Sequence, residues 1–184
     1  QSVVTAGGIQ FKDLTAIGLA IPGVVDPKSG GVIVTPNMNL DGLPIAARLH
    51  ERLKVPVALG NDCNLGALGE AWLGSARNAK SMMSILVGTG IGGGVVRNGK
   101  LWRGAREAAG EIGHIIMEVG GPQCGCGNFG CFEALASRSA IERDLRAGVA
   151  AGRRTMLTDI LKGDLYVIRS GALRDALVAG DDLV

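Results

Sequence analysis

The sequence predicts an α/β fold, because short apolar segments typical of buried strands alternate with segments of helical periodicity. A strand is expected over 15–21, and the turn residues that follow predict a loop over 22–27. A second strand over 32–34 precedes a helix over 44–53, which opens on proline and carries apolar residues at helical spacing. A third strand over 55–59 leads through a Gly-Asn-Asp turn into an alanine- and leucine-rich helix.

The same patterns continue along the chain, and helices dominate its end. No internal repeat or low-complexity linker interrupts them. The remaining predicted strands are 82–87, 95–97 in a hairpin that turns at Asn98-Gly99, and 114–118, and the remaining predicted helices are 131–146, 155–161 and 171–179.

The composition is that of a soluble globular protein with a small-molecule partner. Of the 184 residues, 47% are hydrophobic and 20% charged, which favours a packed core over disorder. Lysine and arginine exceed aspartate and glutamate by only two, 19 against 17, and form no long basic run, so nucleic acid is disfavoured as a partner. No apolar run reaches the roughly 18 residues of a membrane span, and the first residues carry no signal-peptide pattern. We therefore expect a cytoplasmic protein without a membrane partner.

A glycine-rich segment at 88–94, GTGIGGG, directly follows a predicted buried strand, and five of its seven residues are glycine. Backbone N–H groups in such a turn can converge on an anionic oxygen, and Thr89 adds a hydroxyl donor. The segment is therefore a candidate phosphate loop, although no P-loop lysine follows it. The alternative is a plain glycine-rich β-hairpin.

His114 and three crowded cysteines form a candidate metal site. Cys124, Cys126 and Cys131 lie within eight residues, and the glycines between them let the chain fold back on itself. Zinc takes four such ligands tetrahedrally, and a Cys₃His site leaves no position for water, so the metal would be structural. Reduced cysteines without a metal are the alternative. Cys63 lies far away in the sequence and is interpreted as a buried, inert thiol.

Four further polar residues are suited to a polyol pocket. Asn61 and Asp62 stand where a strand meets a helix, so helix N–H groups favour an ionised carboxylate, although N-caps are far commoner than catalytic bases. Glu111 and Glu133 flank the cysteine loop, and each is either a solvated helix-terminal acid or a sugar ligand. Carboxylates and amides recognise sugar hydroxyls in groups, because each acceptor fixes one O–H direction.

An ordered set of segments resembles the ROK family of bacterial sugar kinases and sugar-responsive repressors. The segments are IPGVVDP with the GGV and TPN that follow it, NDCNLGALGE, GTGIGGGVV, AGEIGH and CGCGNFGCFEALAS, and they extend over most of the chain. Within the family, the sequence is most similar to the glucokinase branch.

The resemblance implies part of a two-lobed, actin-like (RNase H-like) ATPase fold with a sugar in the cleft. It implies a hexose kinase that transfers phosphate from ATP, with Mg²⁺, to a hydroxyl of glucose or a related hexose, and it implies a homo-oligomer. The resemblance assigns Asp62 as catalytic base, Asn61, Asp62, Glu111, His114 and Glu133 to the sugar, Gly88, Thr89 and Gly90 to the nucleotide phosphates, His114, Cys124, Cys126 and Cys131 to a structural Zn²⁺, and Asn37 to the pocket rim.

The sequence also departs from the kinases of the family. It contains neither their Asp-x-Gly-Gly-Thr phosphate motif at the start nor their glycine-rich adenosine motif toward the end. We therefore expect a fragment that is inactive by itself. On this interpretation residues 1–61 are the remaining part of the small lobe, and 62–184 are the first part of the large lobe with its zinc-binding loop.

A sugar-sensing repressor of the same family is the alternative function. It would use the same pocket and read DNA through a helix-turn-helix upstream of Gln1. An Asp-x-Gly-Gly-Thr segment at that place would favour the kinase instead. A purely structural zinc module is a third possibility, but it leaves the glycine loop and the Asn61-Asp62 pair unexplained. The sequence leaves open which hexose is used and whether ATP or polyphosphate is the donor.

Overall fold

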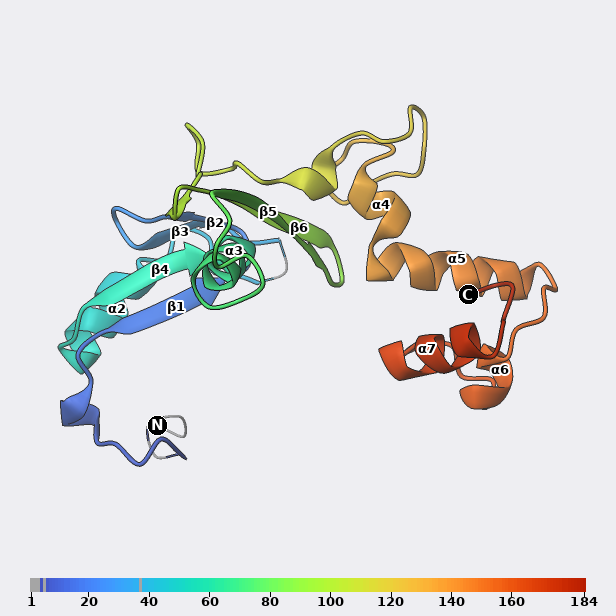
Figure 1. Cartoon of the computed structure of the whole chain (residues 1–184), viewed down its shortest axis with the longest axis horizontal. Helices are drawn as coiled ribbons and strands as arrows, with labels where there is room; N and C mark the ends of the chain where they lie inside the picture. Colours follow the sequence, from blue (N-terminus) through green and yellow to red (C-terminus); the bar gives the residue numbers. More distant parts are fainter. Residues whose placement is uncertain (1–3, 5, 37) are drawn as a thin grey trace. The chain divides into compact units, whose positions relative to one another are not determined.

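The computed structural model describes residues 4, 6–36 and 38–184, and the chain divides into two compact units (Figure 1). The first unit comprises the chain up to residue 86 together with 92–111, and the second comprises 87–91 together with 112–184. The glycine-rich segment is thus divided between the units after Ile91. These bounds differ from the lobes expected at 1–61 and 62–184, and the assignment of lobes stays a prediction.

In the first unit, β1 (Ile17–Ile21) and β4 (Val57–Asn61) pair in parallel. They pack with an antiparallel pair and with helix α2 (Ile45–Leu53), and the apolar core consists of Ile21, Val25, Val32 and Leu59, with Leu19, Leu40 and Ile45 against it. The predicted strands over 15–21 and 55–59 and the predicted helix over 44–53 are confirmed. The short turn η1 (Phe11–Asp13) precedes β1.

The antiparallel pair corrects the loop expected over 22–27, because β2 (Val24–Asp26) lies there and pairs with β3 (Gly31–Val34). Gly23 turns the chain with a φ of +105°, and a Cβ at this position would lie 2.2 Å from the carbonyl oxygen of Val34. The turn folds β2 back onto its partner. A strand of three residues is too short to show a period in the sequence.

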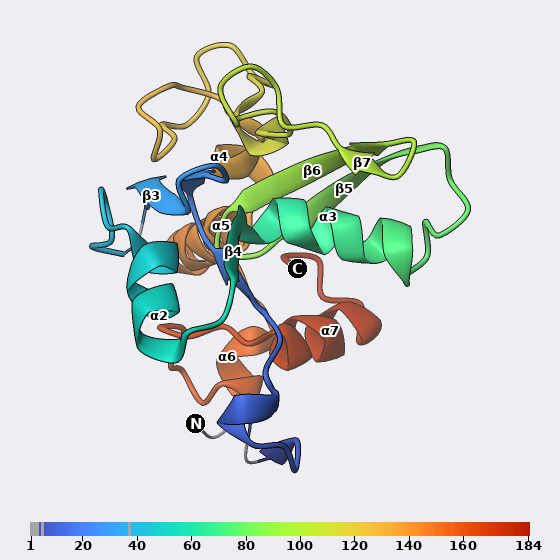
Figure 2. The ribbon, with the colours of Figure 1, turned by 90° about the vertical axis from the view of Figure 1, so that its left-hand side faces the viewer.

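Most of a three-stranded sheet also belongs to the first unit, in the order β5 (Ser81–Val87), β6 (Ile91–Arg97) and β7 (Lys100–Leu101). Helix α3 (Asp62–Trp72) lies along this sheet (Figure 2). The approach is close, because a Cβ at Gly94 of β6 would lie 2.6 Å from the Cβ of Ala67. The predicted strand over 82–87 and the hairpin turn at Asn98-Gly99 are confirmed, since β6 and β7 pair in antiparallel fashion.

The second unit is mostly helical. Its elements are the turn η2 (Ile112–His114) and the helices α4 (Phe132–Ala136), α5 (Arg138–Ala150), α6 (Leu157–Ile160) and α7 (Ser170–Val178). Leu145, Leu157, Ile168, Ala172 and Ala176 are buried together between the last three helices. The helices expected over 155–161 and 171–179 are confirmed with shorter bounds. No helix within 6–36 or 38–184 is both long and apolar enough to cross a membrane.

Two predicted elements of the second unit are wrong. The strand expected over 114–118 is an irregular segment, because the N–H groups of Met117 and Glu118 both donate to the carbonyl oxygen of Gly130 in the cysteine loop. The helix expected over 131–146 is broken at Ser137, which has an extended backbone (φ −69°, ψ 164°). Its hydroxyl accepts the N–H of Ala140, so Ser137 ends α4 and caps α5.

Candidate functional site

The turn between β4 and α3 is held by Asn61, which is the N-cap of the helix. Its Oδ1 accepts the N–H of Asn64 at 2.9 Å, and its Nδ2 donates to the carbonyl oxygen of Gly23 at 3.0 Å. The first bond satisfies one of the free donors of the helix, and the second ties the turn to the loop before β2. The predicted cap is confirmed, and it places the next residue at the first position of the helix.

That residue, Asp62, has a carboxylate that is oriented by hydrogen bonds to its Oδ1. Its Oδ1 accepts the backbone N–H of Cys63 at 2.9 Å and the Nδ2 of Asn61 at 3.2 Å. The thiol of Cys63 also forms a hydrogen bond with the Asp62 carboxylate. A carboxylate at a helix N-terminus is favoured in its ionised form. The side chain is therefore oriented by one oxygen while the other can accept a proton.

Glu111 is an exposed residue of the same unit, and its charge acts on Cys63 in the same turn. Burial, followed by the charge of Asp62 and more weakly that of Glu111, raises the pKa of the half-buried Cys63 thiol to about 11. Cys63 is thus a protonated thiol at neutral pH, as the sequence predicted for an inert residue. Asn61, Asp62 and Glu111 are the three candidate sugar ligands of the first unit.

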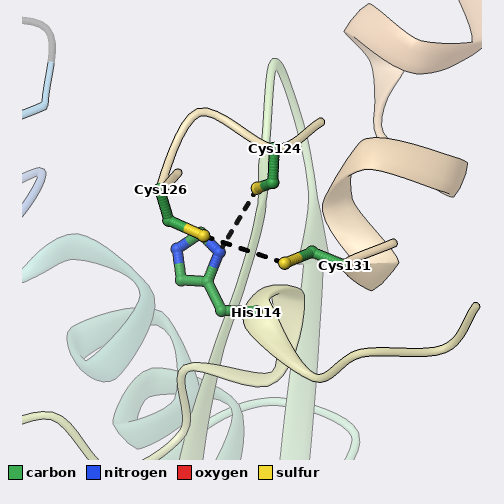
Figure 3. Close-up of side chains that lie close together, drawn as sticks. All are labelled: His114, Cys124, Cys126 and Cys131. Atoms are coloured by element: carbon green, nitrogen blue, oxygen red, sulfur yellow. Dashed lines mark hydrogen bonds between the residues drawn. The ribbon is translucent and has the colours of Figure 1, made fainter. Parts of the chain in front are cut away.

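In the second unit, His114, Cys124, Cys126 and Cys131 converge (Figure 3). Their ligand atoms all lie within 4.8 Å of one another; Cys124 Sγ is 3.7 Å from His114 Nδ1, and Cys126 Sγ is 3.7 Å from Cys131 Sγ. A tetrahedral zinc with bonds of about 2.0 to 2.3 Å places its ligand atoms about 3.3 to 3.8 Å apart. The donor set and the two separations of 3.7 Å fit a closed zinc site.

The three thiols of the cluster differ in burial and in pKa. Cys131 is fully buried and Cys124 is 5% exposed. Burial raises the pKa of the Cys124 thiol to about 12, whereas a hydrogen bond from the backbone N–H of Asn128 lowers the pKa of Cys126. A bound metal takes thiols as thiolates and so replaces the charge stabilisation that burial removes.

Glu133 stands between the metal cluster and the glycine-rich segment. Its Oε2 accepts the N–H of Ile91 at 2.8 Å, and its Oε1 lies 3.6 Å from the Sγ of Cys124. A Cβ at Gly90 would lie 2.2 Å from Oε2, so a larger residue there would displace the carboxylate from its present position. Glu133 therefore contacts both candidate sites of this unit, which the sequence did not predict.

The glycines of the 88–94 segment have two different causes. Gly88 has open space where a Cβ would stand. Gly92 and Gly94 are packed against α3, and a Cβ at Gly92 would lie 2.3 Å from the Sγ of Cys63. Part of the glycine pattern thus serves the contact between helix and sheet.

The predicted site residues are divided between the two units. The first holds Asn61, Asp62 and Glu111, and the second holds Gly88, Thr89, Gly90, His114, Cys124, Cys126, Cys131 and Glu133. Asn37 lies outside the described residues. Sequence reasoning missed Ser139, whose hydroxyl donates to the carbonyl oxygen of Thr89 at 2.8 Å. Its only signal was the Ser-x-Ser pattern within a predicted helix.

Comparisons with known proteins agree with these features. The model of the ROK family matches residues 1–165. A glucokinase of Halalkalibacterium halodurans is 41% identical over 146 residues, which are 79% of this chain and 44% of the relative, and the xylose repressor of Bacillus subtilis is 38% identical over 133 residues, 72% and 34% of the two chains.

Among solved structures, a ROK family glucokinase from Streptomyces griseus in complex with glucose and AMPPNP matches with a TM-score of 0.84 at 31% identity. The match covers 99% of this chain and 59% of that one. The chain thus spans less than half the length of the two curated relatives.

Proposed function

This chain belongs to the ROK family, and on that premise we propose that the protein carrying it is a hexose kinase that transfers the γ-phosphoryl group of ATP to a sugar hydroxyl. The 6-hydroxyl of glucose is the first candidate, because the relatives include glucokinases at 41% identity. The observation that carries the proposal is the geometry of Asp62, a carboxylate fixed through Oδ1 at the first position of helix α3.

Asp62 is the proposed general base. As the sugar oxygen forms its bond to the γ-phosphorus, its proton passes to Oδ2, while the bond between the γ-phosphorus and the bridging oxygen breaks and ADP leaves. Phosphoryl transfer depends more on positioning and charge stabilisation than on covalent chemistry, and Mg²⁺ bound with ATP supplies part of that charge. Orienting the carboxylate through Oδ1 keeps the acceptor oxygen in place.

The residues proposed for the sugar are those of the family resemblance, Asn61, Asp62, Glu111, His114 and Glu133. The carboxylates of Glu111 and Glu133 would accept hydrogen bonds from sugar hydroxyls, and so would the amide oxygen of Asn61, because both N–H bonds of its Nδ2 are already used. Because the Nδ1 of His114 faces Cys124, the other ring nitrogen is the one proposed for the sugar.

The Cys₃His cluster is proposed to hold a structural zinc, with no role in the chemical step. The ion would join His114 of η2 to the loop that ends at Cys131 and α4. It would thereby fix the position from which His114 and Glu133 reach the sugar. The phosphates are proposed to approach Gly88, Thr89 and Gly90, beginning at the open space beside Gly88.

The test of the kinase is ADP release by the complete reading frame with ATP, Mg²⁺ and a panel of hexoses. Turnover with one sugar is the expected result and identifies the substrate. Polyphosphate in place of ATP tests the donor. The proposal is wrong if the protein binds glucose but releases ADP with none of the sugars.

The second candidate is a sugar-sensing repressor, which the 38% identity to a xylose repressor favours. It predicts sugar binding without turnover and sugar-dependent binding of the complete protein to operator DNA. A gel-shift titration with and without each sugar decides this, because a kinase without a DNA-binding segment shifts no DNA. A homo-oligomer and a cytoplasmic location belong to either form of the proposal.

Metal analysis tests the zinc site. Purified protein should contain about one zinc per chain, and Cys131→Ser should lose it. Cys63→Ser is the matched control, because this thiol lies outside the cluster and its substitution should leave the zinc in place. The site is contradicted if folded wild-type protein contains no zinc after incubation in zinc-containing buffer.

A further inference from the structure

Two backbone N–H groups in the first turn of α5 donate to carbonyl oxygens of the glycine-rich segment. The N–H of Arg138 donates to the carbonyl oxygen of Gly88 at 3.0 Å, and the N–H of Ser139 donates to that of Thr89 at 3.4 Å. The hydroxyl of Ser139 reaches the same Thr89 oxygen at 2.8 Å. Two successive carbonyls of the segment are therefore turned toward the start of one helix.

These contacts use the whole first turn. The N–H of Ala140 donates to the hydroxyl of Ser137, and that of Ile141 donates to the Ser137 carbonyl oxygen within the normal helical pattern. A helix N-terminus often binds phosphate through its unpaired N–H groups. Here no such group is left, so α5 itself offers no site for an anion.

The orientation of the two carbonyls fixes the N–H groups that follow them. In a planar trans peptide the C=O and N–H bonds point in opposite directions. Because the oxygens of Gly88 and Thr89 point toward α5, the N–H groups of Thr89 and Gly90 point away from it. Neither N–H has a hydrogen-bond partner among the residues that the structure describes.

We propose that Ser139 is a positioning residue for the nucleotide: it holds the Thr89 carbonyl so that the N–H groups of Thr89 and Gly90 present a paired donor site to a phosphate oxygen. The inference rests on the proposed kinase function for its ligand, a nucleoside triphosphate. Glu133 fixes the far end of the same segment by accepting the N–H of Ile91. The segment is thus held at both ends, with its free donors between.

Three variants of the complete reading frame test this role. Ser139→Ala removes the hydroxyl, and Ser139→Thr restores it at an exposed position with room for a methyl group. Ser170→Ala is the matched control, since its hydroxyl accepts a 2.6 Å bond from the Arg138 side chain and does not touch the segment.

The expected loss is that of one hydrogen bond, about a threefold to tenfold effect. Ser139→Ala should raise the KM for ATP by about this factor, with kcat and the KM for sugar nearly unchanged. Hydrogen exchange of the Gly88 and Ile91 amides, which are the hydrogen-bonded amides of this segment, should accelerate by a similar factor. Ser139→Thr should return both quantities toward wild type, and Ser170→Ala should change neither.

The proposal is overturned if Ser139→Ala leaves both quantities at wild-type values, or if Ser170→Ala shifts them equally, which would indicate a general structural role. If the wild-type protein turns over no sugar, the kinase proposal fails separately. Hydrogen exchange then decides by itself whether Ser139 holds the segment.

Discussion

Helices α3 and α5 both begin after an extended residue with a capping side chain, yet they use their first turns differently. In α3, Asn61 accepts the N–H of Asn64, and Asp62 accepts that of Cys63. These bonds join residues no more than three apart. In α5, the first two N–H groups reach the carbonyls of Gly88 and Thr89, fifty residues earlier in the chain. The first turn of α3 is completed locally and displays a carboxylate, whereas that of α5 is completed by a distant loop.

This difference explains what each helix can do. A helix that satisfies its own donors through acidic and amide side chains retains an ionised group for chemistry. A helix that gives its donors to another segment fixes that segment instead. The proposed base therefore belongs to α3 and the proposed support of the phosphate loop to α5.

The largest expected effect is on turnover and concerns α3. Asp62→Asn should lower kcat of the complete reading frame by about 10²- to 10⁴-fold, because the amide cannot take the sugar proton. Sugar binding should persist, since an amide oxygen can still accept the N–H of Cys63. Glu70→Gln, in the same helix, is the control and should leave kcat unchanged. A fall of less than tenfold in Asp62→Asn would remove Asp62 as base.

The next effect is on stability and compares the two caps. Asn61→Ala and Ser137→Ala each lose a cap, which costs about 1 kcal/mol of unfolding free energy. Asn61→Ala should cost more, because it also loses the bond to the Gly23 carbonyl. Urea unfolding separates the effects on the two units. Both tryptophans, Trp72 and Trp102, lie in the first unit, so their fluorescence reports its unfolding.

In that experiment, circular dichroism follows the helices of both units. Asn61→Ser keeps an N-cap and loses the two bonds that Nδ2 donates, to the Gly23 carbonyl and to Asp62 Oδ1, so its stability should lie between wild type and Asn61→Ala. A larger loss in Ser137→Ala than in Asn61→Ala would reverse the comparison.

The smallest effect is on the pH dependence of stability: the contribution of Cys63 in α3 should be lost at high pH, and that of Glu142 in α5 at low pH. Burial raises the pKa of Cys63 from its ordinary 9.0 to about 11, so the stability that this thiol contributes is lost as pH rises through that range. Burial raises the pKa of Glu142 in α5, but hydrogen bonds from Arg138 and Arg146 outweigh it and hold the pKa below 4.5. That stability is lost as pH falls through the range below 4.5.

Metal-loaded protein is the material for this test, and unfolding is followed from pH 3 to 11. Cys63→Ala should flatten the alkaline limb and Glu142→Gln the acid limb. Each variant is the control for the other. If either variant flattens the opposite limb, the assignment of that limb to its helix is wrong.

Much of the site could be predicted because its contacts are short in sequence. The cap at Asn61, the position of Asp62 and the crowding of Cys124, Cys126 and Cys131 follow from turn geometry and ligand chemistry over a few residues. The helix expected over 131–146 was wrong for a related reason. Its apolar pattern continues through Ser137, and a single extended residue does not interrupt a pattern.

The sequence by itself determined the groups that can act: a capped carboxylate, three thiols and an imidazole, and a segment with few side chains. The tertiary structure decided which backbone groups those residues meet. The N–H of Ile91 donates to Glu133, 42 residues away, and the Thr89 carbonyl accepts the hydroxyl of Ser139, 50 residues away. Within 88–94, Gly88 lies beside open space, whereas Gly92 and Gly94 contact helix α3. The physical reason is that a local hydrogen bond is fixed by the dihedral angles of a few residues, whereas a long-range one exists only after the packing of whole elements has brought its donor and acceptor together.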